Sequence, residues 1–187
     1  MRKTQISVAL LAIISLSAIA LYAASLAGVT LPDSQQVAGK SLVLNGLGLR
    51  TKMFVKVYVA GLYLEQKSSD AGAIMKSDSP KRIVMHFVYH PSKSQMVDAF
   101  QEGFEGNSPD ALKTMKPDID NLNAALQDLN AGDEMVFTYV PGTGTTLAIN
   151  GKDKVTMAGL PFEQALLSVW LGPKPPTADV KKGMLGQ

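Results

Sequence analysis

The segment from Met53 to Glu65 (MFVKVYVAGLYLE) constrains the fold of this chain most, because valine, tyrosine and phenylalanine dominate it. These residues favour the pleated, half-buried surface of a β-strand. Gly61 lies within the run and marks a bulge or a close backbone approach. A shorter apolar run, Ser41 to Leu44, ends at Asn45-Gly46, which is a strong hairpin signal. We therefore expect an antiparallel sheet, with a turn at Asn45-Gly46 and a returning strand that begins over residues 47–50.

Arg50 lies between these two apolar runs, where burying its charge without an anionic partner would be expensive. It either lies in water at the edge of the sheet, which is the common fate of arginine, or it binds a carboxylate or an enolate. Tyr58 is a candidate second donor, although a buried tyrosine commonly bonds a backbone group instead. The two residues would lie about 26 Å apart on one straight strand. They can share a ligand only if the chain turns near Thr51-Lys52.

The rest of the chain holds further strands and amphipathic helices, and the helices are clustered rather than alternating with the strands. Helices are expected over residues 70–77, 92–106, 108–130 with a break at Pro117, and 161–171. The second of these begins with a capping box formed by Ser92 and Gln95. Further strands are expected over residues 81–89, 134–140, 145–150 and 154–158. Tight turns make the neighbouring strands antiparallel, so the sequence predicts one α+β domain with a large antiparallel sheet and helices packed on one face.

The N-terminus has the pattern of a secretory signal peptide, in which two basic residues precede an apolar run from Ile6 to about Ala24. We expect cleavage after Ala27, which divides the chain into a signal peptide, residues 1–27, and one mature domain, residues 28–187. The mature domain would then be periplasmic. The apolar run is long for a signal peptide, so an uncleaved leader that anchors the chain to the inner membrane is the alternative.

The charge balance argues against nucleic acid as a partner. The chain has 18 basic and 16 acidic residues, and removal of the leader with its two basic residues leaves 16 of each. Positive and negative residues are interleaved, so no basic footprint is present. The absence of cysteine excludes disulfides, thiol catalysis and zinc–thiolate sites.

The histidines and acidic pairs do not predict a metal site. His86 and His90 would lie about 13 Å apart on a strand, too far to share an ion. The segment Asp118-Ile119-Asp120 lacks the glycine and the closing glutamate of a calcium loop, and it is typical of acids at a helix N-terminus. We expect neither a metal nor a cofactor.

The run from Phe54 to Glu65 closely resembles the signature strand of the chalcone isomerase superfamily. The glycine-rich Gly46-Leu47-Gly48-Leu49-Arg50 is similar to the approach to that family's arginine, and Ala165 to Gly172 (ALLSVWLG) is similar to its last helix. The resemblance extends from about Val37 to Gly172, and is greatest with the bacterial, exported chalcone isomerase-like group. It implies an open-faced β-sandwich, in which helices cover a large antiparallel sheet and a ligand cleft lies between the layers.

The resemblance also distinguishes two chemistries. True chalcone isomerases cyclise a chalcone with an arginine assisted by threonine, tyrosine and asparagine, whereas a plant branch binds fatty acids through the arginine and a tyrosine. Arg50 matches the shared arginine, and Tyr58 stands where the enzymes carry threonine, as it does in the fatty-acid binders. Ala99 falls near the asparagine position and Val169 at a position where the enzymes carry threonine. Most of the auxiliary catalytic residues are therefore not matched.

The resemblance thus favours an exported protein that binds a small amphipathic carboxylate, such as a fatty acid, through Arg50 and Tyr58. The first alternative is an isomerase or intramolecular lyase that acts on a chalcone-like enone or polyphenol, with Arg50 as its catalytic residue. The second alternative is a non-catalytic envelope accessory protein, which an exposed apolar patch away from the cleft would favour.

Overall fold

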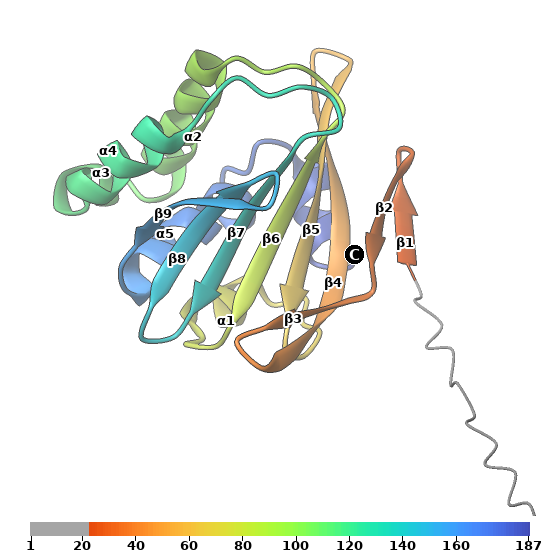
Figure 1. The fold of residues 1–187 in the computed structure, drawn as a ribbon, viewed down its shortest axis with the longest axis horizontal. Coiled ribbons are helices and arrows are strands. Elements are labelled where there is room, and N and C mark those ends of the chain that lie inside the picture. The colour runs from red at the N-terminus through yellow and green to blue at the C-terminus, as the bar shows by residue number, and fades with distance from the viewer. Residues whose placement is uncertain (1–22) are drawn as a thin grey trace, which may run out of the picture.

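The computed structural model describes residues 23–187, and its framework is a seven-stranded antiparallel sheet (Figure 1). Strand order in the sheet follows chain order, because each strand pairs with the one before it through a turn or a helical connection. The strands are β3 (Ser34–Val37), β4 (Lys40–Lys52), β5 (Val55–Leu64), β6 (Lys81–Phe87), β7 (Glu134–Val140), β8 (Gly144–Ile149) and β9 (Lys152–Met157). The predicted antiparallel sheet is confirmed.

The helices pack on one side of this sheet, which confirms the predicted α+β class (Figure 1). They are α1 (Ala71–Lys76), α2 (Lys93–Asn107), α3 (Ala111–Thr114), α4 (Lys116–Ala125), α5 (Leu160–Leu171) and α6 (Ala178–Met184). The main core lies between sheet and helices, where Leu62 and Phe137 of the sheet meet Phe100 of α2 and Trp170 of α5. Burying such side chains is the main source of stability.

A small second sheet covers the opposite face near β4 and β5. It consists of β1 (Ala23–Leu26) and β2 (Val29–Pro32), and it packs Leu31 against Tyr63 in a second core. The Tyr63 hydroxyl also donates to the carbonyl oxygen of Pro32 at 2.8 Å. A Cβ on Gly61 would lie 2.6 Å from a methyl group of Leu31. The prediction of a bulge or a close backbone approach at Gly61 is therefore wrong, because the ladder is regular there and the close neighbour is a side chain.

The hairpin predicted at Asn45-Gly46 is wrong. Strand β4 continues through this dipeptide with a bulge between Leu44 and Gly46. The glycines are needed because α6 lies directly on the strand, and a Cβ on Gly46 or Gly48 would collide with the α6 backbone. Asn45 also binds the C-terminal end of α6, because its side-chain amide donates to the Met184 carbonyl at 2.8 Å.

The chain reverses instead at Met53-Phe54, inside the segment predicted as one strand. Lys52 pairs with Val55, so Met53 and Phe54 form a two-residue loop between β4 and β5. Both residues have positive φ angles, +47° and +70°. Asn-Gly is the usual sequence for such a turn, and its absence here explains why the turn was not predicted.

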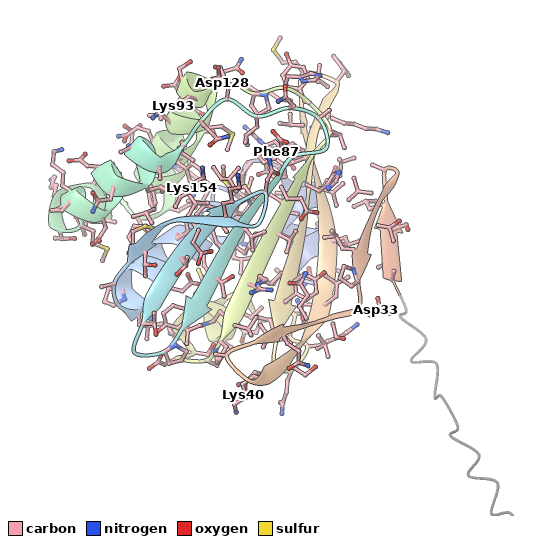
Figure 2. All side chains as sticks on the ribbon, in the orientation of Figure 1. Asp33, Lys40, Phe87, Lys93, Asp128 and Lys154 are labelled. Carbon is pink, nitrogen blue, oxygen red and sulfur yellow. The ribbon has the colours of Figure 1, made fainter. Side chains whose placement is uncertain are left out.

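The helix boundaries were predicted in part. The capping box at the start of α2 is confirmed, because Ser92 accepts from the Gln95 backbone and the Gln95 side chain accepts from the Ser92 backbone. The helix predicted to reach residue 130 ends at Ala125. The segment beyond it caps α2 instead, with the Asp128 carboxylate accepting from the Lys93 backbone N–H at 2.7 Å. Figure 2 shows these two side chains close together at the upper edge of the molecule.

The predicted leader lies almost entirely outside the described residues, which begin at Ala23. Its last residues form β1, so cleavage after Ala27 would remove that strand. The cleavage site stays a prediction. Within residues 23–187, no helix has the length and apolar character needed to cross a membrane.

Candidate ligand-binding cleft

The β4–β5 hairpin brings the two predicted site residues together. Arg50 and Tyr58 are direct partners in the ladder, so they lie on the same face of the sheet. The Arg50 guanidinium carbon lies 5.8 Å from the centroid of the Tyr58 ring. The turn that allows this follows the predicted position at Thr51-Lys52 by two residues.

Both residues line a cavity between the sheet and the helices α2 and α5. The cavity has a volume of about 210 Å³, and Met85 of β6 contributes to its lining from the sheet side. From α2 it is lined by Met96, Ala99, Phe100 and Gly103, whose spacing places them on one helix face. A second cavity of about 300 Å³ shares Arg50, Met96, Ala99 and Glu102 with the first. Arg50 therefore lies where the two cavities meet.

Gly103 allows α2 to lie close to α5 along this cavity. A Cβ at this position would lie 2.7 Å from a methyl group of Val169 on α5. Both residues line the 210 Å³ cavity. A larger residue at 103 would push the two helices apart, so this glycine sets the width of the cleft at that point.

The Arg50 guanidinium has unsatisfied hydrogen-bonding capacity. Its Nε atom is buried and has no hydrogen-bond partner. Among residues 23–187, the ion pairs join Lys40 to Glu65, His86 to Glu134 and Lys116 to Asp120, and none of them includes Arg50. A buried donor without a partner costs about 1–3 kcal/mol. An anionic ligand in the cavity would remove that cost.

Tyr58 adds a second donor. Its hydroxyl oxygen accepts a hydrogen bond from the indole Nε1 of Trp170 at 2.9 Å. Burial raises the pKa of Tyr58 and outweighs the opposing effects of Arg50 and of the Trp170 bond. The phenol is therefore neutral near pH 7 and keeps its proton. No hydrogen bond found among the described residues uses that proton, so Tyr58 can donate it to a ligand.

Trp170 is a site residue that sequence reasoning missed. It is the only tryptophan of the chain, and it is 1% exposed on α5. Because a buried indole N–H usually has an acceptor, the sequence did indicate that Trp170 would bond a polar group if it were buried. The identity of the acceptor could not be read from the sequence, because the two residues are 112 positions apart.

The remaining wall of the 210 Å³ cavity is mainly apolar. Ala99 and Val169 line it at the positions where the resemblance places polar catalytic residues. The other charged residues of the lining, Glu102 and Lys174, are exposed. The cleft can thus hold an anion beside Arg50 and Tyr58, with an apolar group against Met96 and Val169.

The histidine and acidic residues that did not predict a metal site from the sequence lie outside this cleft. The His86 Nδ1 atom lies 3.2 Å from the carboxylate of Glu134, its partner across β6 and β7. Asp118 lies in the first turn of α4, as expected. In the part of the chain that the structure describes, no group of three or more histidine and acidic residues could hold a metal ion.

The sequence of residues 23–186 matches the profile of a family described as chalcone isomerase-like. The chain belongs to this family. The resemblance drawn from the β4–β5 segment is thereby confirmed for the family as a whole. None of the curated proteins compared with the chain matches it.

A solved structure with a similar fold is that of a fatty-acid binding protein from Arabidopsis thaliana. It is 14% identical to this chain, with a TM-score of 0.70, and the match covers 88% of this chain and 96% of that one. At this identity the similarity shows the fold. It confirms the predicted arrangement of a large sheet covered by helices.

Proposed function

We propose that this chalcone isomerase-like protein is exported and binds a small amphipathic carboxylate, with a fatty acid as the first ligand to test. The main support for this proposal is the Nε of Arg50, which is buried and has no hydrogen-bond partner. Tyr58, whose hydroxyl proton is also free, lines the same cavity as Arg50. A carboxylate between them would accept a charge-assisted hydrogen bond from the guanidinium. It would accept another from the phenol.

The cavity walls suit the apolar part of such a ligand. Met85, Met96 and Phe100 line the cavity and are themselves buried. A largely apolar lining with a few convergent polar groups is typical of small-molecule sites. The Arabidopsis protein with a similar fold is a fatty-acid binding protein, which supports the same ligand class.

Export rests on the N-terminal pattern of two basic residues and a long apolar run. It implies a periplasmic location, and retention of the leader would instead anchor the domain to the inner membrane. The proposed binding of a ligand in the cleft is compatible with a free periplasmic domain and with an anchored one.

The same cavity offers less to the isomerase alternative. Arg50 could stabilise a developing oxyanion, but Ala99 and Val169 provide no polar side chain to assist it. A reaction would therefore depend on Arg50 and Tyr58 alone. Ligand binding requires only the donors that the cleft presents.

Lipid extraction and mass spectrometry of the purified protein, followed by displacement of a fluorescent fatty acid, test the proposal. Arg50→Ala should lower fatty-acid affinity by about 10- to 100-fold, because it removes a hydrogen bond to a charged group. The matched control is Arg82→Ala on β6, whose guanidinium donates to Gln35 and Thr138 and does not line the cavity. If no ligand is extracted and Arg50→Ala binds fatty acids as well as Arg82→Ala does, the proposal is wrong.

A further inference from the structure

The strongly exposed large hydrophobic residues of the described chain lie in one place. Met53, Phe54 and Val55 are 85%, 101% and 43% exposed, and Tyr89 is 40% exposed. The first three form the tip of the β4–β5 hairpin, which projects past the ends of the neighbouring strands at the top of Figure 1. Tyr89 follows Val88, whose backbone N–H donates to the Val57 carbonyl at 3.0 Å, so it lies beside the same hairpin. We call Met53, Phe54, Val55 and Tyr89 the apolar tip.

The presence of Met53 and Phe54 at the turn of the apolar tip is not explained by the turn itself. Met53 and Phe54 have the left-handed φ angles that side chains with a Cβ avoid. Asparagine and glycine would adopt this turn more easily. The tip therefore exposes two large apolar side chains to water, and neither its exposure nor its turn conformation stabilises the fold.

The charged side chains on the hairpin that carries the apolar tip are positive, and the nearest acidic residues, Asp98 and Glu102, lie across the cavity on α2. Lys52 and Lys56 flank it and are both exposed, and residues 50–57 include no acidic side chain. Apolar side chains bordered by lysines are suited to an anionic lipid surface, where the apolar groups enter the acyl boundary and the cations meet the headgroups. Tyrosine is also enriched at that interface.

The apolar tip borders the outer part of the cleft. Met53, Val55 and Tyr89 line the 300 Å³ cavity, which Arg50 also lines. Asp98 and Glu102 of α2 contribute to the same cavity from the helix side. A group that enters beside the tip therefore meets a continuous lining that ends at Arg50.

We propose that the apolar tip docks on an anionic lipid surface, with Lys52 and Lys56 at the headgroups, so that the mouth of the cleft opens against the bilayer. Passage of an acyl chain from the bilayer to Arg50 rests on the function proposed above. Docking itself does not. An exposed apolar patch away from the cleft would have favoured the envelope accessory protein, but the apolar tip lies beside the cleft.

The test is the fluorescence of the Phe54→Trp variant of the full chain mixed with phosphatidylcholine vesicles that contain or lack phosphatidylglycerol. Docking predicts a blue shift of the emission, together with quenching by lipids brominated on their acyl chains, when phosphatidylglycerol is present. Trp170 is buried and adds a constant background. The matched control is Lys40→Trp at the opposite end of β4, labelled at the lower edge in Figure 2. Its emission should not change.

Two further variants separate the electrostatic contribution to docking from the binding of fatty acid. Lys52→Gln with Lys56→Gln, added to Phe54→Trp, should raise the lipid concentration at half shift by about 25-fold, since each lysine near an anionic surface contributes a factor of about 5. Adding Arg50→Ala should leave the shift unchanged although it lowers fatty-acid affinity, so failure of docking and failure of the proposed function are distinguishable.

Two outcomes would overturn the docking proposal. The first is an emission of Phe54→Trp that stays the same on anionic vesicles. The second is a blue shift that grows with protein concentration without vesicles, which would identify a second copy of the chain as the occupant of the apolar tip.

Discussion

Among single residues, Arg50 and Tyr58 present hydrogen-bond donors rather than acceptors to the 210 Å³ cavity. The Arg50 guanidinium can only donate, and the Tyr58 oxygen already accepts from Trp170. What remains for a ligand is the guanidinium of Arg50, whose buried Nε–H has no partner, and the hydroxyl proton of Tyr58. An ionised carboxylate only accepts hydrogen bonds, so the cleft should select it over amines and neutral alcohols.

Tyr58→Phe tests the second donor. We expect fatty-acid affinity to fall by about 10-fold or more, because the hydrogen bond that the Tyr58 hydroxyl donates to the charged carboxylate is lost. The free energy of unfolding should also fall by about 1–3 kcal/mol, since the Trp170 indole N–H loses its acceptor. Tyr63→Phe is the control, because the Tyr63 hydroxyl bonds Pro32 on the other face of the sheet. A Tyr58→Phe variant that keeps full affinity would remove the phenol from the site.

Glu163 predicts a pH dependence of stability. It is 3% exposed, and its carboxylate accepts a hydrogen bond from Thr145 at 2.7 Å. Burial raises the pKa of Glu163 to about 7, against the smaller opposing effects of Thr145 and Lys81. The folded state therefore holds a proton that the unfolded state releases above about 4.5. Stability from this group is fully present below that pH and is lost as the pH rises to about 7, by on the order of 3 kcal/mol.

Urea unfolding of Glu163→Gln at several pH values measures this effect. The variant should lack the loss of stability between about pH 4.5 and 7 and should be more stable than the parent above pH 7. Glu105→Gln, at an exposed position of α2, should keep the parent's pH profile. Identical profiles for the two variants would show that Glu163 is not the group responsible.

At the scale of elements, the contact between β4 and α6 depends on the absence of side chains. A Cβ on Gly48 would collide with the carbonyl of Val180, and one on Gly183 would collide with the carbonyl of Leu47. Backbone atoms cannot move aside as a flexible side chain can. The strand that carries Arg50 is thus held by close backbone packing of the C-terminal helix.

Gly48→Ala should lower the free energy of unfolding by about 3 kcal/mol, because overpacking forces α6 away from the strand. Gly106→Ala in α2 is the matched control, since a Cβ there would lie 3.5 Å from the Lys174 side chain, an ordinary contact. That change should stabilise the protein by about 0.5–1 kcal/mol through helix propensity. Equal effects of the two substitutions in chemical denaturation would contradict the close packing of α6 on β4.

Elements set by local chemistry could be predicted, and those set by distant contacts could not. The capping box of α2 satisfies its own backbone groups within four residues, so its start was predicted correctly. The Asn45-Gly46 dipeptide has the chemistry of a turn, but α6 contacts it from 139 residues away and requires an extended strand there. The tail helix α6 was missed, although the Thr177 side chain caps it at the Val180 N–H.

At the scale of the whole molecule, the candidate cleft follows from the layered fold. The helices cover one face of the sheet and the β1–β2 hairpin covers part of the other, so the cavities between the sheet and α2 are bounded by buried core. The sheet and the helices on one face could be predicted from the sequence. The side-chain geometry of the cleft could not, because it joins β4, β5, α2 and α5.

Binding of a carboxylate by Arg50 in this cleft can be measured by NMR of a fatty acid that is labelled with ¹³C at its carboxyl group and bound to the protein. A nearby guanidinium lowers the pKa of a carboxyl group by about 1 to 3 pH units. We predict that the bound carboxyl titrates that far below the same acid in water, and that Arg50→Ala abolishes the difference. A bound carboxyl with the same titration curve in the parent protein and in Arg50→Ala would contradict it.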